Sequence, residues 1–139
     1  MLKQESYVLK VKKQVLDEIL KQAEREKPLE ACGYLGVRGT VGEKVFPMTN
    51  IDKSEVHFSF DPKEQFQTVK KARQNGLSLS VVYHSHPHSP ARPSAEDIRL
   101  AYDPNIIYMI VSMAQSKPET RAYKIKEGAV LEQSIEVIE

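Results

Sequence analysis

Several features that would restrict the function of a protein are missing from this sequence. It has one cysteine, Cys32, so it cannot form an internal disulfide and has no need of an oxidising compartment. No apolar run approaches the roughly 18 residues of a membrane-spanning helix, and the residues after Met1 lack the apolar stretch of a secretory signal. The net charge of +1 gives no reason to expect a nucleic acid or an anionic membrane as partner. We therefore expect a cytoplasmic enzyme or binding domain.

The length and composition predict one folded unit. A chain of 139 residues can bury roughly two-thirds of its unfolded surface around one core. Its composition, 40% apolar and 28% charged, is ordinary for a globular protein, and no repeat, low-complexity tract or linker divides it. We expect a single domain over residues 1–139. The sequence does not decide between a monomer and a homodimer.

Hydrophobic patterns predict alternating helices and strands. Apolar residues at three- and four-residue spacing predict a helix from Lys13 to about Glu26, ended near Pro28. Two more helices are expected over residues 62–74 and 94–101. Strands are expected over residues 7–11, 29–37, 44–48, 56–60, 77–84, 105–112, 121–126 and 130–138. The fold class is therefore α/β, with two to three helices flanking a mixed, mostly antiparallel β-sheet.

The helix expected over residues 62–74 has signals at both ends. Asp61 can cap it, Pro62 suits the first helical position, and Glu64 can complete a capping box. Asn75 followed by Gly76 is a typical stop.

Two histidines define the candidate site. His84 and His86 end an apolar strand, and the side-chain period of two in a strand points both imidazoles from the same face. Asp97 follows eleven residues later, in the first turn of a helix that begins near Ser94, where its carboxylate can turn back toward them. Two histidines and one aspartate form a three-ligand set with room for a water, which is the pattern of a catalytic rather than a structural zinc site.

Structural roles are open for several of these residues. Ser94 with Asp97 three positions later has the pattern of an N-cap serine and its capping-box acid, a role that can coexist with one in the site. A histidine outside a cluster is usually a surface or satisfied residue, and this is the default for His57, on the alternating segment 56–60, and for His88. Because His88 lies in the site loop, contact with a substrate stays an alternative for it. Cys32 has no identifiable basic partner, so we expect it in the core.

The full spacing of His-x-His, seven residues, Ser, two residues and Asp resembles the signature of the JAMM (MPN+) metalloprotease family. Residues 84–87 (His-Ser-His-Pro) and 93–97 (Pro-Ser-Ala-Glu-Asp) carry it. The family also has a glutamate ahead of a short strand, and residues 28–36 resemble that segment with Glu30 in its place. Spacing alone would not select Glu30, although a carboxylate between apolar neighbours is costly to bury unless it has a function. The likeness extends from the first helix through residues 106–111.

The resemblance implies a single-domain JAMM/MPN fold of the cytidine-deaminase-like type and a zinc metallopeptidase activity. It assigns one Zn²⁺ ion to His84, His86 and Asp97. It makes Glu30 the general base that moves the proton of the attacking water, and Ser94 the donor of a hydrogen bond to the oxyanion.

The resemblance also implies a substrate class. JAMM enzymes generally cleave the peptide or isopeptide bond after the C-terminal Gly-Gly of ubiquitin-like proteins. Small stand-alone members are associated with sulfur carriers of the ThiS/MoaD type, and one such role frees cysteine built on the carrier's C-terminus. A Gly-Gly tail is physically apt, since glycine lets backbone pass through a narrow groove. The implied partner is a ubiquitin-like sulfur-carrier protein with a C-terminal Gly-Gly, from which the enzyme releases cysteine or trims the tail.

Three rival functions are weighed against this one. A catalytically silent MPN interaction module would be expected to have lost ligands, and all are present here. A RadC-like DNA-repair-associated protein has a similar His-x-His and Ser-x-x-Asp pattern, but its additional helical region has no room in this chain. A zinc nucleoside deaminase needs two cysteine ligands, and the chain has one cysteine in total.

Overall fold

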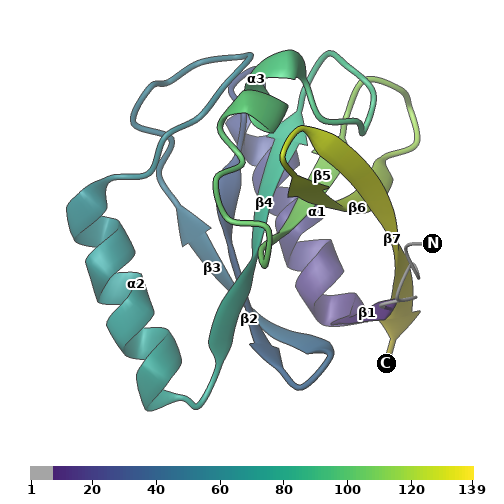
Figure 1. Ribbon diagram of the computed structural model, residues 1–139. Coiled ribbons are helices and arrows are strands. Elements are labelled where there is room, and N and C mark those ends of the chain that lie inside the picture. The colour runs from purple at the N-terminus through teal and green to yellow at the C-terminus, as the bar shows by residue number, and fades with distance from the viewer. Residues whose placement is uncertain (1–7) are drawn as a thin grey trace.

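The computed structural model describes residues 8–139, in which seven strands hydrogen-bond in the order β1-β3-β2-β4-β5-β6-β7 (Figure 1). β7 also pairs with β1, so the sheet closes into a barrel. The strands are β1 (Val8–Lys12), β2 (Cys32–Arg38), β3 (Val41–Met48), β4 (Ser78–His86), β5 (Ile107–Ser112), β6 (Glu119–Lys126) and β7 (Ala129–Ile138). The helices are α1 (Lys13–Glu26), α2 (Pro62–Gln74) and α3 (Ala95–Arg99).

The sheet is mixed, with more antiparallel than parallel pairings. β2 runs antiparallel to β3 and β4, and β6 runs antiparallel to β5 and β7. β1 is parallel to β3 and β7, and β4 is parallel to β5. The predicted α/β class with a mixed, mostly antiparallel sheet and three helices is confirmed. Because all seven strands share one sheet, nothing in the described range divides the chain, and a single domain over residues 1–139 stays a prediction.

Two layers of side chains pack against opposite faces of the sheet. On one face Val15 and Ile19 of α1 join the main core with Leu35, Tyr83 and Met109 from three strands. On the other face α2 packs against β3 and β4 around a second cluster that includes Cys32, Tyr34 and Phe46. Figure 1 shows α1 and α2 on opposite sides of β4. β4, which carries both histidines, is therefore a central strand. Within residues 8–139 no helix is both long and apolar enough to cross a membrane.

Most element predictions agree with the structure. α1 occupies the predicted residues, and the first strand begins at Val8, with Tyr7 outside the described residues. The predicted pair over residues 121–126 and 130–138 is the β6–β7 hairpin, which turns at Gly128 with φ +80°. β2 starts at Cys32 rather than near residue 29, so Glu30 lies just ahead of the strand. The helix predicted over residues 94–101 is shorter, and Ser94 is its N-cap.

The strand predicted over residues 56–60 is wrong. These residues form an irregular loop between β3 and α2, and the Val56 side chain is 71% exposed rather than half-buried. The reason lies in the polar side chains that precede them. The Ser54 hydroxyl accepts hydrogen bonds from the backbone N–H groups of Val56 and His57, and the Asn50 side chain binds further backbone groups of the loop. Such local bonds compete with a sheet ladder for the same backbone groups.

The caps of α2 are confirmed in part. The Asp61 carboxylate accepts from the backbone N–H of Lys63, and Gly76 follows the C-cap with φ +67°. The predicted capping box is wrong, because the Glu64 carboxylate instead accepts hydrogen bonds from the backbone N–H and the hydroxyl of Thr49. Glu64 thus ties α2 to the end of β3.

Candidate metal centre

The carboxyl end of β4 brings the two histidines together. His84 pairs with Cys32 of β2 and with Ile110 of β5, so it has strand neighbours on both sides, and His86, the last residue of β4, pairs with Ser112 of β5. Both side chains are buried, and their Nε2 atoms lie 3.0 Å apart, as expected for alternate residues on one face of a strand. The Nδ1 of His86 donates to the carbonyl of Pro90 at 2.8 Å, which leaves its Nε2 lone pair free to bind a cation.

The capping box of α3 delivers the carboxylate. The Ser94 hydroxyl accepts from the backbone N–H of Asp97 at 3.0 Å, and the backbone N–H of Ser94 donates to Asp97 Oδ2 at 2.9 Å. The same Oδ2 lies 3.2 Å from the Nε2 of each histidine. Asp97 therefore completes the cap of α3 and also faces the two histidines, so the two roles coexist as the sequence pattern allowed. Because Ser94 Oγ accepts from Asp97, its own hydroxyl hydrogen stays available for another acceptor.

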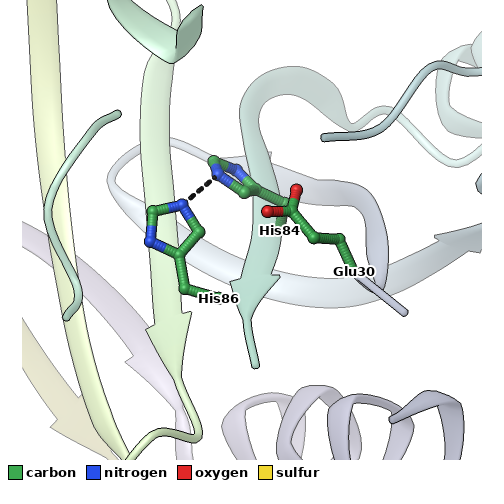
Figure 2. Close-up of side chains that lie close together, drawn as sticks. All are labelled: Glu30, His84 and His86. Carbon is green, nitrogen blue, oxygen red and sulfur yellow. Dashed lines mark hydrogen bonds between the residues drawn. The ribbon is translucent and has the colours of Figure 1, made fainter. Parts of the chain in front are cut away.

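Glu30 lies beside the histidines with an unpaired oxygen. Its carboxylate oxygen and one ring nitrogen of each histidine lie within 4.8 Å of one another, and Figure 2 shows the three side chains gathered in one place. Glu30 is 3% exposed, and its Oε1 is buried without a hydrogen-bond partner. A buried carboxylate oxygen without a donor is costly, so this position is the kind that a functional role retains.

Ser85, between the two histidines, holds the residue after Glu30. The backbone N–H of Ala31 donates to Ser85 Oγ at 2.8 Å, and the backbone N–H of Ser85 donates to the carbonyl of Ala31 at 2.9 Å. This pair continues the β2–β4 ladder one step beyond Cys32. Sequence reasoning missed this role, since no local pattern connects Ser85 with a residue 54 positions earlier.

The surroundings raise the pKa of some titratable groups of the site and lower the pKa of others. Burial lowers the pKa of His84, which favours its neutral form. Burial also acts to lower the pKa of His86, but hydrogen bonds to Asp97 and the Pro90 carbonyl outweigh it and raise that pKa. For Asp97, burial acts to raise the pKa, yet the hydrogen bonds from the two histidines hold it well below its usual range. Burial raises the pKa of Glu30 to about 8. One carboxylate is thus kept ionised and the other is able to carry a proton near neutral pH.

These residues fit a tetrahedral cation. Three lone-pair atoms, the Nε2 atoms of His84 and His86 and Oδ2 of Asp97, lie 3.0 to 3.2 Å from one another. Zinc bonds of about 2.0–2.1 Å at tetrahedral angles separate ligand atoms by about 3.3 Å. The donor set of two imidazoles and one carboxylate is also one that catalytic zinc sites use. The ligand atoms of Glu30, His84 and His86 form a looser set, within 4.8 Å of one another. The shorter distances in the set with Asp97 favour Asp97 as the third ligand.

Two other predicted structural roles agree with the observed contacts. His88 is exposed, and its Nε2 lies 2.8 Å from Glu55 Oε1. Cys32 is a buried free thiol whose Sγ donates to the carbonyl of Met48, and burial raises its pKa, so it is not a reactive thiolate. His57 departs from its default in one respect. Its Nδ1 lies 3.0 Å from Asp52 Oδ2, but its ring also lines the cavity beside the site.

A mostly apolar cavity of about 230 Å³ opens beside His84 and Asp97. Its walls come from the loop before α2, from α3 and from strands β4 to β6. They include Phe58, Phe60, Val82, Leu100, Tyr108 and Ile110. The Phe58 ring packs on the His84 imidazole, with 4.8 Å between the ring centroids. The cavity therefore offers a substrate an apolar surface that ends at the cluster of His84, His86 and Asp97.

In the metal-free protein, Glu30→Gln is expected to raise stability at alkaline pH. The pKa of Glu30 rises from 4.5 to about 8, so the folded state retains a proton that the unfolded state has released, and wild-type stability falls as the pH rises across this window. Glutamine does not ionise, so the advantage of the variant grows over the same window, to about 2 kcal/mol or more above it. Urea unfolding of both proteins in chelator, at about pH 5 and pH 9, measures the difference. An equal difference in the free energy of unfolding at both pH values would contradict the prediction that the folded state retains the proton of Glu30.

Two histidines, an aspartate and a buried glutamate meet at one end of a mixed barrel. This arrangement assigns the protein to the class of metal-dependent hydrolases. The chain belongs to the family of prokaryotic homologs of the JAB domain, whose profile matches residues 12–126. The predicted membership of the JAMM (MPN+) family is thereby confirmed.

Curated relatives and a solved structure agree with this assignment. The chain is 35% identical over 136 residues to the CysO-cysteine peptidase of Mycobacterium tuberculosis, covering 96% of this chain and 93% of the relative. It is 38% identical over 95 residues to a probable TtuB-protein conjugate cleaving protease of Thermus thermophilus, covering 68% and 64%. The solution structure of a Desulfitobacterium hafniense protein superposes with a TM-score of 0.87 at 44% identity, covering 95% of this chain and 93% of that one.

Proposed function

We propose that this protein is a zinc-dependent peptidase that hydrolyses the bond after the C-terminal Gly-Gly of a ubiquitin-like protein, of the ThiS/MoaD sulfur-carrier type. The observation that carries the proposal is the convergence of three ligand atoms within 3.2 Å of one another beside a buried carboxylate oxygen that has no partner. His84, His86 and Asp97 would hold the ion. When bound, zinc lowers the pKa of a water toward about 7 and polarises the carbonyl of the scissile bond.

Glu30 is the general base in this proposal. Its carboxylate takes a proton from the attacking water while the water oxygen bonds to the carbonyl carbon. When the carbon–nitrogen bond breaks, Glu30 passes the proton to the leaving amine. Its Oε1 is buried without a hydrogen-bond partner, so this oxygen is free to accept the proton and return it.

Ser94 stabilises the charge that develops on the carbonyl oxygen. Its oxygen is fixed by the N–H of Asp97, so the hydroxyl hydrogen is held at the mouth of α3, one turn from the carboxylate. A donor that is already in place when charge develops in a transition state has no reorganisation to undergo, which is the basis of oxyanion stabilisation.

The substrate class follows from the relatives and agrees with the cavity. The relatives are named a CysO-cysteine peptidase and a probable TtuB-protein conjugate cleaving protease. We extend this to a carrier with a Gly-Gly tail, whose narrow backbone can pass beside buried side chains at His84 and Asp97. Release of cysteine and trimming of the carrier tail are two outcomes of the same hydrolysis.

The proposed reaction needs one chain. Glu30, His84, His86 and Asp97 come from three segments of the same protomer, so a homodimer is compatible with the site but is not required for it. The buried free thiol of Cys32 suits a reducing compartment, and we propose a cytoplasmic location.

Cleavage of an extended carrier tests the proposal. A ubiquitin-like sulfur carrier that ends in Gly-Gly-Cys is incubated with the zinc-loaded protein, and intact mass is followed. We expect the carrier to lose the mass of one cysteine residue, and we expect a chelator to stop the reaction because the ligand set binds a single catalytic ion.

The matched control for this experiment is the same carrier with an Ala-Ala-Cys end, which should stay intact if glycine is needed for passage to the site. A zinc-loaded protein that leaves every Gly-Gly carrier intact would support the silent MPN interaction module instead. Salt-sensitive binding to DNA would favour the RadC-like alternative.

A further inference from the structure

The loop between β3 and α2 is built around one buried amide, that of Asn50. Asn50 is 4% exposed, although the loop has no regular secondary structure. Its Nδ2 donates to the carbonyls of Glu30 at 3.1 Å, His57 at 3.0 Å and Ser54 at 3.4 Å. Its Oδ1 accepts from the backbone N–H groups of Asp52 at 3.1 Å and Ser59 at 3.4 Å. One side chain therefore satisfies five backbone groups, four of the loop and one of Glu30.

The main chain of Glu30 depends on this loop. Glu30 precedes β2, and the β2–β4 ladder begins only at Cys32. The backbone N–H of Glu30 donates to the carbonyl of Ser54 at 2.9 Å, and the Glu30 carbonyl accepts from Asn50. Both polar groups of the Glu30 backbone are thus bonded to the loop that Asn50 closes.

The ligand residues are held by different contacts. His84 and His86 lie in the β4–β5 ladder, and the carboxylate of Asp97 is fixed by the backbone of Ser94. None of these contacts passes through Asn50. The geometry separates the side chains that would bind the ion from the glutamate that would move the proton. Asn50 bonds directly to the Glu30 backbone, whereas it reaches His84 only through the ring of Phe58 in the same loop.

The backbone of the loop is also held in a conformation that it would not adopt alone. Lys53 has φ +45°, in the left-handed region that residues other than glycine rarely occupy. Such a conformation persists where surrounding contacts determine it. The neighbouring bonds of Asn50 to Asp52 and Ser54, on either side of Lys53, are those contacts.

We propose that Asn50 is a positioning residue that holds Glu30 at the distance and angle needed for proton transfer. This inference rests on the proposed function. Without the amide, the buried carbonyl of Glu30 loses its donor, and the segment that carries the carboxylate loses the bond that fixes it against the loop. The ion-binding residues would keep their places.

The test compares Asn50→Ala with Asn105→Ala, whose asparagine is exposed. For Asn50→Ala we expect kcat to fall about ten- to a hundredfold, because displacement of a catalytic group by about 1 Å has effects of that size. The fall in kcat is measured at saturating substrate, because His57, Phe58 and Phe60 of the same loop line the cavity and KM reports separately on substrate binding there. Zinc content and the absorption spectrum of the cobalt-substituted protein should match the wild type. Asn105→Ala should match it in every measurement.

A double-mutant cycle with Glu30→Gln separates positioning from general destabilisation. If Asn50 acts through Glu30, Asn50→Ala should lower kcat no further once the base has been removed. A structural role would lower kcat equally in both backgrounds. Limited trypsin digestion gives a readout independent of activity: cleavage after Lys53 should accelerate in Asn50→Ala, and not in Asn105→Ala.

Three results would overturn the inference: unchanged kcat in Asn50→Ala, an additive cycle with Glu30→Gln, or loss of zinc together with activity. If Asn50→Ala does not fold, Asn50→Asp replaces it, because the aspartate keeps the acceptor for Asp52 and Ser59 while removing the donor to Glu30. The proposed function fails separately, since in that case the wild-type protein itself would leave Gly-Gly carriers intact.

Discussion

Replacing Glu30 by glutamine is expected to lower turnover by about 10²–10⁴-fold while the protein keeps its zinc. Glutamine has nearly the same shape, but it has no carboxylate to accept the proton of the attacking water. The three closest ligand atoms belong to other residues, so the ion should still bind. Turnover of a Gly-Gly-Cys carrier by intact mass, together with the zinc content of the same preparation, measures both halves of the expectation.

The matched control for this variant is Glu24→Gln on the exposed side of α1, which should behave as wild type. Full activity in Glu30→Gln would reject the assignment of the base. Loss of zinc in Glu30→Gln would point to the looser set, in which Glu30 rather than Asp97 joins the two histidines as a ligand. The gain in metal-free stability at alkaline pH should accompany the loss of turnover, because both follow from the same buried carboxylate.

Asp97→Asn is expected to weaken zinc binding by more than about 100-fold, since loss of a mere hydrogen-bond partner of a ligand already costs 10–100-fold. The amide keeps an oxygen that can accept from the backbone N–H of Ser94, so α3 should stay capped. What is lost is the negative charge that faces His84 and His86 at 3.2 Å. Zinc added to the wild type should raise its stability by about 2.7 kcal/mol at 100 times the dissociation constant, and the variant should show little of this increase.

Competition titration against a zinc indicator measures the affinity, and thermal unfolding with and without zinc measures the linked stability. Asp17→Asn, on the exposed surface of α1, makes the same change of side chain away from the site and serves as the control. If Asp97→Asn binds zinc as tightly as the wild type, Asp97 acts only as the capping residue of α3. The asparagine variant is preferred to Asp97→Ala, which would remove the cap and a ligand together and so confuse the two roles.

Local patterns located the parts of the site that lie close together in the sequence. The strand period of two brought His84 and His86 to one face, and the capping pattern from Ser94 to Asp97 predicted the turn that aims the carboxylate. Glu30 was selected through the resemblance to JAMM enzymes, because spacing did not single it out from the other acidic residues and its apolar neighbours gave only a supporting signal. The loop over residues 56–60 was predicted wrongly, since its alternation resembles a strand while the polar groups of Asn50 and Ser54 bind its backbone instead.

Short-range patterns were therefore enough to predict the α/β class, the long helices, and the approach of Asp97 to the histidine pair, because strand periods and helix caps act over a few residues and a short loop joins β4 to α3. Three features became visible in the folded protein alone: the sheet closes through β1 and β7, Ser85 is hydrogen-bonded to Ala31, and Asn50 is hydrogen-bonded to Glu30. These contacts join residues that are 20 or more positions apart. Packing of the whole core determines which distant backbone groups come into contact, so a local sequence pattern does not predict these contacts.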